Sequence, residues 1–448
     1  MNKVTFLNHS SVLLQRGDNF ILTDPWYDKP AFGSWLSVPP PIYHPAYFIA
    51  MAKSNPKFAI VISHGHDDHL DDNFLSIMPK ETTVLIPKYK SAGLIRRIQK
   101  CGLTNIKQFD SKGLTHNGAV FKSYIFEDIS MDDAFITIDY KEDFIVAHAN
   151  DNWQELPTSV KKQVKSDFLK HKRENTLFMS QTNLADGFPL IYDNYTQEEK
   201  KVLVKKRQDK MILTSVNNAI SVGAGAFLSY AGLASPFIKN QDNFINDSYS
   251  KSLLYIKDLL LKNNLDSSLV LDMMPGDSYN FKNVVKLFNN QFYSHEQLKE
   301  ASVEFYNKYG VVSKCDTFQD HQEKMDIKNK RSKLDLFLYE FKKFLMAKSR
   351  QTNYKEDVHS INFTFKDSEI SQQCKLSDDS KCDVVFVYDN IILEEILRGK
   401  INWENSYIGY ESRVLTDKQY NIGSLIRWLS MFGYVYQNRV IKNNEVLR

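Results

Sequence analysis

The feature that most constrains this chain is a cluster of histidines and aspartates at the end of an apolar run. Residues 59–63, AIVIS, are typical of a buried strand, and the motif His-x-His-x-Asp-His (His64, His66, Asp68, His69) follows at once. Residues two apart in an extended segment share a face, so His64 and His66 can bind one metal ion. The turn that follows carries Asp68 and His69 toward a second ion. The motif therefore predicts two neighbouring metal ions at the end of a strand.

Short runs rich in β-branched and aromatic residues lie on both sides of this motif and are typical of strands. The expected strands are residues 3–7, 11–15, 19–24, 58–63, 82–87, 119–126, 134–140 and 144–149. Helical stretches near 71–78 and 91–101 interrupt them. The first third of the chain therefore favours a layered α/β fold over an all-β sandwich.

Composition argues against several classes of partner. The 57 Lys and Arg residues nearly balance the 54 Asp and Glu residues and are spread along the chain, so we expect no nucleic-acid partner. The longest apolar runs fall short of the ~20 residues that a membrane helix needs, so we expect no membrane partner. The four cysteines are too few and too scattered for a disulfide framework, which favours a cytoplasmic location.

The motif and the opening stretch NHSSVLLQRGDNFILTDPW, residues 8–26, together resemble the metallo-β-lactamase fold superfamily. The resemblance implies a four-layer αββα fold. It also implies that Asp24 supports the metal ligands through hydrogen bonds. His9 and His148 are further candidates for supporting residues. His148 lies three residues before Asp151, and it would be a ligand instead if the strand end curls. Asp151, in the stretch FIVAHANDNW, stands where this family places the aspartate that bridges the two metals.

The chain departs from that family in one informative place. Most members supply a further histidine before the strand that leads to the bridging aspartate, but residues 124–140, YIFEDISMDDAFITIDY, contain none. Glu127 or Asp128 occupies the place, so the resemblance implies that a carboxylate substitutes. Oxygen ligands beside imidazoles favour iron, with manganese and zinc as alternatives. The family's last histidine, which completes the second metal, has no clear match, and His171 is expected on a solvated helix face.

Further segments narrow the resemblance. ADGFPLIYD (185–193), MMPGDSYNF (273–281) and the stretch 396–420 are similar to the CMP-N-acetylneuraminate hydroxylase family, in the part that follows its Rieske domain. That family's Rieske cluster needs Cys-x-His and Cys-x-x-His pairs, and no cysteine here has a histidine two or three residues on. The chain also resembles the diiron β-hydroxylase family of chloramphenicol biosynthesis, which joins this fold to the same motif and uses a glutamate ligand.

These resemblances imply a diiron oxygenase that uses O₂ on a small-molecule, nucleotide-sugar or carrier-bound substrate, with a separate electron donor as partner. The competing implication is a hydrolase of a phosphoester, lactone or amide. In such an enzyme the two metals lower the pKa of a bridging water to about 7.

The length of 448 residues predicts two or three domains, and the sequence patterns divide the chain into three regions. Residues 1–300 would form the metallo-β-lactamase-fold catalytic domain, 301–349 a helical connector, and 350–448 a small α+β domain. We predict that this last domain packs on the first, contributes no metal ligand, and holds Trp403 and Tyr407 in its core. The aromatic segment 24–35, DPWYDKPAFGSW, is expected to cover the metal site as a loop.

Overall fold

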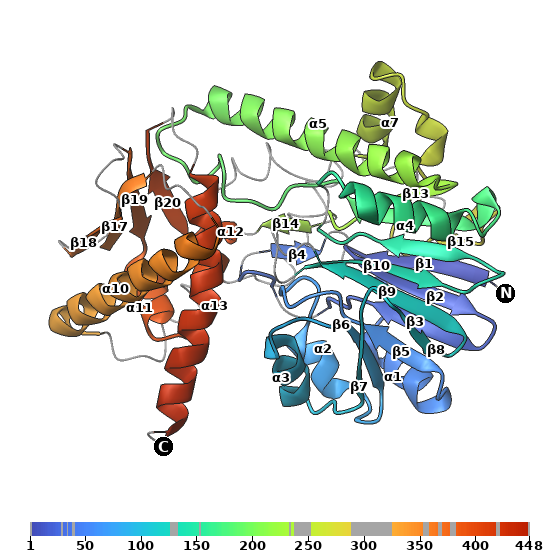
Figure 1. Ribbon diagram of the computed structural model, residues 1–448, viewed down its shortest axis with the longest axis horizontal. Coiled ribbons are helices and arrows are strands. Elements are labelled where there is room, and N and C mark those ends of the chain that lie inside the picture. Colours follow the sequence, from blue (N-terminus) through green and yellow to red (C-terminus); the bar gives the residue numbers. More distant parts are fainter. Residues whose placement is uncertain are drawn as a thin grey trace.

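The chain is described by a computed structural model that has a larger α/β part, which contains the N-terminus, and a smaller part, which contains the C-terminus (Figure 1). We call the described residues from 325 onward the C-terminal unit. The described residues are 2–27, 30–33, 35–37, 41–125, 133–151, 154–232, 234–236, 252–287, 325–352, 358–365, 370–376, 382–417 and 422–446.

The first sheet has eight strands within the described residues, in the order β16-β15-β1-β2-β3-β5-β6-β7. Its strands are β1 (Asn2–Asn8), β2 (Ser11–Arg16), β3 (Asn19–Thr23), β5 (Phe58–Val61), β6 (Thr83–Pro87), β7 (Ile106–Phe109), β15 (Ser278–Tyr279) and β16 (Val284–Val285). Strands β16 to β3 pair antiparallel, and β3, β5, β6 and β7 pair parallel. Because β5 lies inside the sheet, all four of its side chains are buried.

The second sheet has six strands in the same described part of the chain, in the order β13-β12-β11-β10-β9-β8. Its strands are β8 (Leu114–His116), β9 (Ala119–Ile125), β10 (Ala134–Asp139), β11 (Ile145–His148), β12 (Thr176–Gln181) and β13 (Ala226–Tyr230). Strands β11, β12 and β13 run parallel, and β8 to β11 pair antiparallel.

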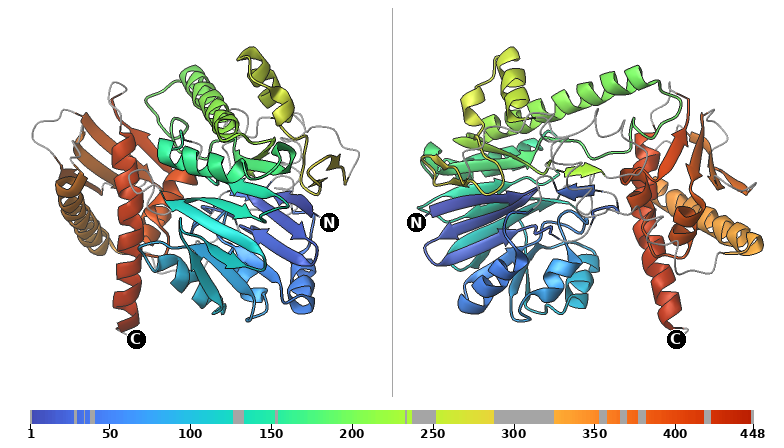
Figure 2. Two further views of the ribbon diagram at one scale, coloured as in Figure 1. Left: turned by 45° about the vertical axis from the view of Figure 1, so that its right-hand side comes forward. Right: turned by 180° about the vertical axis from the view of Figure 1, so that it is seen from behind.

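The two sheets pack face to face with helices on both outer faces (Figures 1 and 2). One buried cluster joins β1 residues such as Phe6 to β10 residues such as Ile138, and two further clusters line the outer faces. The helices on the first sheet are α1 (Pro45–Ser54), α2 (Asp72–Ile77) and α3 (Gly93–Lys100). Those on the second are α4 (Thr158–Phe168), α5 (Gln197–Val222) and α7 (Leu253–Lys262), and the 3₁₀ turns are η1 (Arg173–Asn175) and η2 (Ser267–Leu269). The expected four-layer αββα fold is confirmed.

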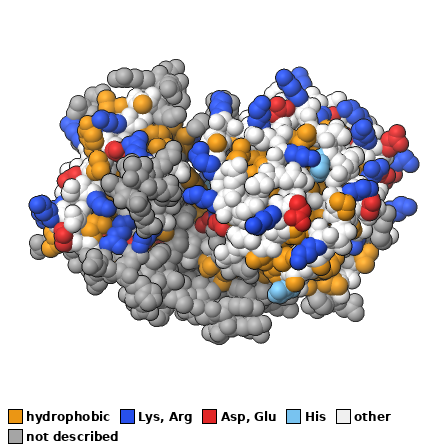
Figure 3. Space-filling model, turned by 90° about the horizontal axis from the view of Figure 1, so that it is seen from below, with side chains coloured by type: hydrophobic (Ala, Val, Ile, Leu, Met, Phe, Trp, Pro, Cys, Tyr) orange, Lys and Arg blue, Asp and Glu red, His pale blue; other side chains and the backbone are white. Residues whose placement is uncertain are grey.

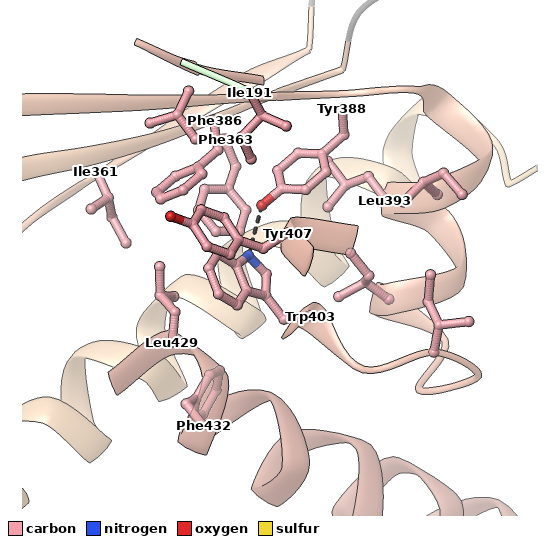
Figure 4. Packing of buried hydrophobic residues seen from close by; sticks show 14 of the residues in the cluster. Ile191, Ile361, Phe363, Phe386, Tyr388, Leu393, Trp403, Tyr407, Leu429 and Phe432 are labelled. Carbon is pink, nitrogen blue, oxygen red and sulfur yellow. Dashed lines mark hydrogen bonds between the residues drawn. The ribbon is translucent and has the colours of Figure 1, made fainter. Parts of the chain in front are cut away.

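The C-terminal unit contains one sheet, as far as the chain is described, in the order β18-β17-β19-β20. The strands are β17 (Val358–Phe365), β18 (Ser371–Lys375), β19 (Cys382–Tyr388) and β20 (Ser412–Leu415). The helices are α10 (Ile327–Thr352), α11 (Asn390–Leu397), α12 (Trp403–Ile408) and α13 (Gly423–Val446). Trp403 and Tyr407 are buried in its core, and the Trp403 indole donates to the Tyr388 hydroxyl at 2.6 Å (Figure 4).

The core of the C-terminal unit continues into the first part of the chain. The same buried cluster includes Trp26, Trp35 and Ile191, and the Trp35 indole N–H donates to the Ile408 carbonyl at 2.9 Å. Trp35 lies in β4 (Trp35–Ser37), which pairs with β14 (Ala234–Pro236). The two parts of the chain thus share one hydrophobic core.

Two surface features complete the description. On the face shown in Figure 3, the described Lys and Arg side chains are scattered among Asp and Glu rather than gathered in one patch. Among the described helices, none combines the length and the apolar character that crossing a membrane requires.

Candidate metal centre

The His-x-His-x-Asp-His motif lies in a loop between β5 and α2. The loop begins where the buried strand β5 ends, and Asp71 closes it by capping α2, since its carboxylate accepts from the backbone N–H of Asn73 at 2.9 Å. The end of β5 and the capped N-terminus of α2 therefore fix the two ends of the loop. His64 and His69 are fully buried and Asp68 is nearly so.

One group of donors consists of His64, His66 and Asp151. His64 Nε2 lies 2.7 Å from His66 Nδ1, and each of these nitrogens lies 3.6 Å from Asp151 Oδ2. Two donors that bind one ion at about 2.1 Å each, at right angles, stand about 3 Å apart. The three atoms therefore surround a space of the size that one metal ion needs.

The other group consists of His9, Asp68 and His69. His9 Nε2 lies 3.0 Å from Asp68 Oδ2, and His69 Nε2 lies 3.7 Å from the same oxygen. His69 Nε2 also lies 3.5 Å from Asp151 Oδ1. Asp151 thus turns one oxygen toward each group, which is the position of a bridging carboxylate.

Asp24 supports this centre from within the protein. Its Oδ2 accepts from His69 Nδ1 at 2.8 Å and from His148 Nε2 at 2.9 Å, and its Oδ1 accepts from the Ser63 backbone N–H at 2.7 Å. Burial opposes ionisation of Asp24, but the two imidazoles outweigh it and hold its pKa well below the usual range. With Nδ1 of His69 hydrogen-bonded to Asp24, its Nε2 is left to face the donors.

His148 supports the centre and does not face it. Its Nε2 is hydrogen-bonded to Asp24, and its Nδ1 lies 2.7 Å from the Tyr230 hydroxyl. Both ring nitrogens are therefore engaged away from the two donor groups. His148 is the last residue of β11, and it is fully buried.

The donor groups contain polar atoms that the protein itself does not satisfy. His69 Nε2 and Asp68 Oδ1 are buried and have no hydrogen-bond partner among the described residues. An unpartnered buried nitrogen or carboxylate oxygen is costly, and cations held between them would satisfy both. The residues present thus fit a metal centre.

The carboxylate expected at Glu127 or Asp128 lies outside the described residues. In the described part, Asp133 stands at the start of β10, nearly buried, with Oδ1 3.8 Å from His64 Nδ1. Burial and the neighbouring charge of Asp151 raise the pKa of Asp133 to about 7. The segment thus brings a carboxylate close to His64.

Arg97 of α3 holds the motif loop from behind. Its guanidinium donates to the Gly65 carbonyl at 2.5 Å, to Asp67 at 2.8 Å and to Asp72 at 2.8 Å. It also reaches the Leu70 carbonyl at 3.1 Å. One planar side chain thus fixes both halves of the loop. Arg97 could not be predicted from a local pattern, because its partners lie 25 to 32 positions earlier in the chain.

Two described aromatic residues of segment 24–35, Trp26 and Phe32, lie beside the centre. The Phe32 ring stands edge-on to His66 with centroids 5.7 Å apart, and the Trp26 ring does the same to His9 at 5.1 Å. The prediction for His171 was wrong: its side chain is only 1% exposed, and Nε2 lies 3.0 Å from Asp139. His171 is buried because it follows the end of α4, where the chain turns toward η1.

With this geometry established, comparison with known proteins identifies the first part of the chain. Residues 3–138 match the family model for the Beta-lactamase superfamily domain. This part of the chain is therefore similar to a β-lactamase superfamily domain. The match covers β1 to β10, including the motif loop and Asp24, and confirms the predicted metallo-β-lactamase fold.

The predicted similarity to the sialic acid hydroxylase family is also confirmed. The chain is 28% identical over 245 residues to the cytidine monophosphate-N-acetylneuraminic acid hydroxylase of Asterias rubens. The alignment covers 51% of this chain and 34% of that protein. The chain thus matches about a third of the length of this relative.

Solved structures similar to this chain include both hydrolases and a hydroxylase. An isothiocyanate hydrolase from Delia radicum gut bacteria has a TM-score of 0.41, with 12% identity and coverage of 62% of this chain and 98% of its own. CmlA, a diiron β-hydroxylase from Streptomyces venezuelae, has a TM-score of 0.39, with 12% identity and coverage of 64% and 54%.

Proposed function

We propose that the chain is a dinuclear metal enzyme, and that with iron it is an oxygenase acting on a small molecule. The observation that carries the proposal is the position of Asp151, whose two oxygens face the two donor groups. His64 and His66 would hold one ion and Asp68 and His69 the other. A shared carboxylate keeps two ions within the few ångströms over which both can act on one substrate.

The donor chemistry supports iron. Two carboxylates, Asp68 and Asp151, lie among the imidazoles of the two groups. A site built from imidazoles and carboxylate oxygens suits iron or manganese better than a site built from imidazoles and thiolates does. The relative from Asterias rubens, to which half of the chain is similar, is named a hydroxylase, which favours oxygenase over hydrolase chemistry.

Two bound iron ions would supply the activation of O₂ at this centre. The chain's own residues prepare it. Asp24 orients His69, and Arg97 holds the motif loop. Phe32 and Trp26 place apolar rings against His66 and His9, which limits the access of water to the donors.

The substrate and the electron source are part of the same proposal. A nucleotide sugar or another small or carrier-bound molecule is the substrate class, in line with the name of the Asterias rubens relative. The four cysteines lack the histidine spacings of a Rieske cluster, so we propose that electrons come from a separate donor.

The second candidate function is hydrolysis. It is favoured by the three imidazoles of the motif, His64, His66 and His69, since imidazole is also a preferred ligand of zinc. Asp151 could then bridge two zinc ions that activate a water molecule for attack on a phosphoester, lactone or amide.

One experiment separates the two functions. Protein stripped of metal is loaded anaerobically with iron, reduced and exposed to O₂, and a matched sample is loaded with zinc. We expect the iron form to consume O₂ with a change in its absorption spectrum, and the zinc form to remain inert toward phosphoesters and lactones. Asp151→Asn is the control, since it removes the bridge. An iron form inert to O₂ beside a zinc form that hydrolyses these substrates would establish the hydrolase instead.

A further inference from the structure

His9 holds an unusual position in the turn between β1 and β2. Its backbone lies in the left-handed region, with φ 34°, which costs a residue with a side chain free energy. Its carbonyl accepts from the Ala231 backbone N–H at 2.8 Å, and its ring packs edge-on against Trp26. The turn is thus held in a strained conformation that aims the imidazole inward.

The imidazole reaches the second donor group. His9 Nε2 lies 3.0 Å from Asp68 Oδ2, and the side chain is 7% exposed. Three possible ligand atoms, one each from His9, Asp68 and His69, lie within 4.8 Å of one another. A spacing of about 3 Å is what two neighbouring donors on one ion would show, given metal–donor bonds of about 2.1 Å.

The second group needs a further donor. Without His9 it offers Asp68, His69 and the far oxygen of Asp151, and the last histidine expected from the family resemblance has no match in the sequence. His148 cannot take its place, because both of its nitrogens are engaged by Asp24 and Tyr230. Among the described residues, His9 is the histidine that completes this group.

We propose that His9 is a ligand of the second metal, so that the first turn of the chain supplies the donor that the later segments lack. This inference rests on the dinuclear centre proposed above. The competing role for His9 is that of a hydrogen-bond donor that only orients Asp68. The two roles differ in the state of Nε2. As a metal ligand, Nε2 carries no proton and offers its lone pair, whereas as a hydrogen-bond donor to Asp68 it carries a proton.

The pair of variants His9→Glu and His9→Gln distinguishes these roles. Both side chains reach about as far as imidazole Nε2, and both meet the same backbone strain. Glu offers a metal ligand and cannot donate to Asp68, whereas Gln can donate and is a poor ligand. We expect iron-loaded His9→Glu to keep two equivalents of metal. We expect His9→Gln to keep one, with the affinity for the other lowered at least about tenfold, as measured by metal analysis and competition with a chelator.

The other outcomes are equally decisive. Two equivalents in His9→Gln at wild-type affinity would overturn the proposal, whatever His9→Glu binds. If both variants hold one equivalent, His9→Gly decides, because glycine accepts the left-handed backbone and leaves space for free imidazole. Recovery of the second equivalent on addition of imidazole supports ligation, and continued loss overturns it.

Two controls keep the interpretation specific. His116→Gln changes a histidine outside both donor groups and should keep two equivalents at wild-type affinity. Wild-type protein that binds fewer than two equivalents would contradict the dinuclear centre itself. Wild-type protein with two equivalents beside a fully loaded His9→Gln would contradict only the role of His9.

Discussion

Glu404 and His66 face each other across the boundary between the C-terminal unit and the metal centre, with Glu404 Oε2 3.7 Å from His66 Nε2. This nitrogen is the one opposite Nδ1, which faces His64 and Asp151. Glu404 Oε2 is buried and has no hydrogen-bond partner among the described residues. Burial opposes protonation of His66, but Asp151 and Glu404 outweigh it and raise its pKa to about 10. The C-terminal unit therefore places a carboxylate beside a side chain of the candidate metal centre.

Replacing Glu404 by glutamine should weaken metal binding at the His64–His66 group. Carboxylates on the far nitrogen of a metal-bound imidazole orient the ring and raise its basicity, and their loss costs about 10- to 100-fold in affinity. Competition with a chelator measures the change. Glu340→Gln is the matched control, because Glu340 is a C-terminal carboxylate paired with Arg439. Wild-type affinity in Glu404→Gln would contradict the role assigned to this residue.

Replacing Arg97 by lysine should loosen the motif loop. Lysine keeps the charge but lacks the planar fork that donates at once to Gly65, Asp67 and Asp72. We expect about a tenfold loss of metal affinity and faster hydrogen exchange of the loop amides. Arg96→Lys, one residue away on the exposed side of α3, should change neither quantity. Equal behaviour of the two variants would show that the fork is dispensable.

Removing the metals should lower the melting temperature. Ligand binding stabilises the folded state by about 4 kcal/mol when the free metal is 1,000 times its Kd. Without metal, the carboxylates of Asp68 and Asp151 both stay near His69 Nε2, at 3.7 and 3.5 Å, and the charge of Asp151 opposes ionisation of Asp68. Thermal unfolding with and without chelator measures the difference. Asp151→Asn should show a much smaller shift, and an equal shift would place the metals elsewhere.

Asp167 should contribute to stability in a pH-dependent way. Burial opposes its ionisation, but hydrogen bonds from Lys122 and Lys170, each 2.6 Å long, outweigh it and lower its pKa. Because the folded-state pKa is below the unfolded value of about 4, this contribution is full above pH 4 and is lost as the pH falls through the folded-state pKa. Asp167→Asn should cost about 1.5–3 kcal/mol at neutral pH.

Urea unfolding of the metal-free protein at pH 7 and pH 3 tests the prediction for Asp167. The wild type should lose more stability between the two pH values than Asp167→Asn does. Parallel losses in the two proteins would mean that other carboxylates carry the acid sensitivity.

The strands of the first domain were predictable because each is a local pattern. Residues 58–63 and 134–140 are apolar and β-branched, and they fold as β5 and β10. Strand β18, with the sequence SQQCK, was missed because it pairs only with β17 at the edge of its sheet and has no apolar alternation. Helix α1 was missed because its side chains are mixed, with only Phe48 fully buried.

The site was predictable where its residues are adjacent in sequence. The spacing of His64, His66, Asp68 and His69 places them on one loop, and the structure brings Asp151 to them from β11. Glu404 gave no local signal, because its nearness to His66 depends on how the C-terminal unit packs. His9 was expected to support the centre, and only the folded turn shows that its ring reaches Asp68.

The hydrophobic core shared by Trp26, Trp35 and the C-terminal unit has an evolutionary consequence. The aromatic segment beside His66 packs against residues more than 300 positions later in the chain, as the hydrogen bond from the Trp35 indole to the Ile408 carbonyl shows. A mutation that enlarges or shrinks a side chain on one side of this core must be answered on the other. Selection that preserves the candidate metal centre will therefore also act on residues of α12 and β20. A chimera in which only the α/β part or only the C-terminal unit is exchanged for that of a relative should be inactive.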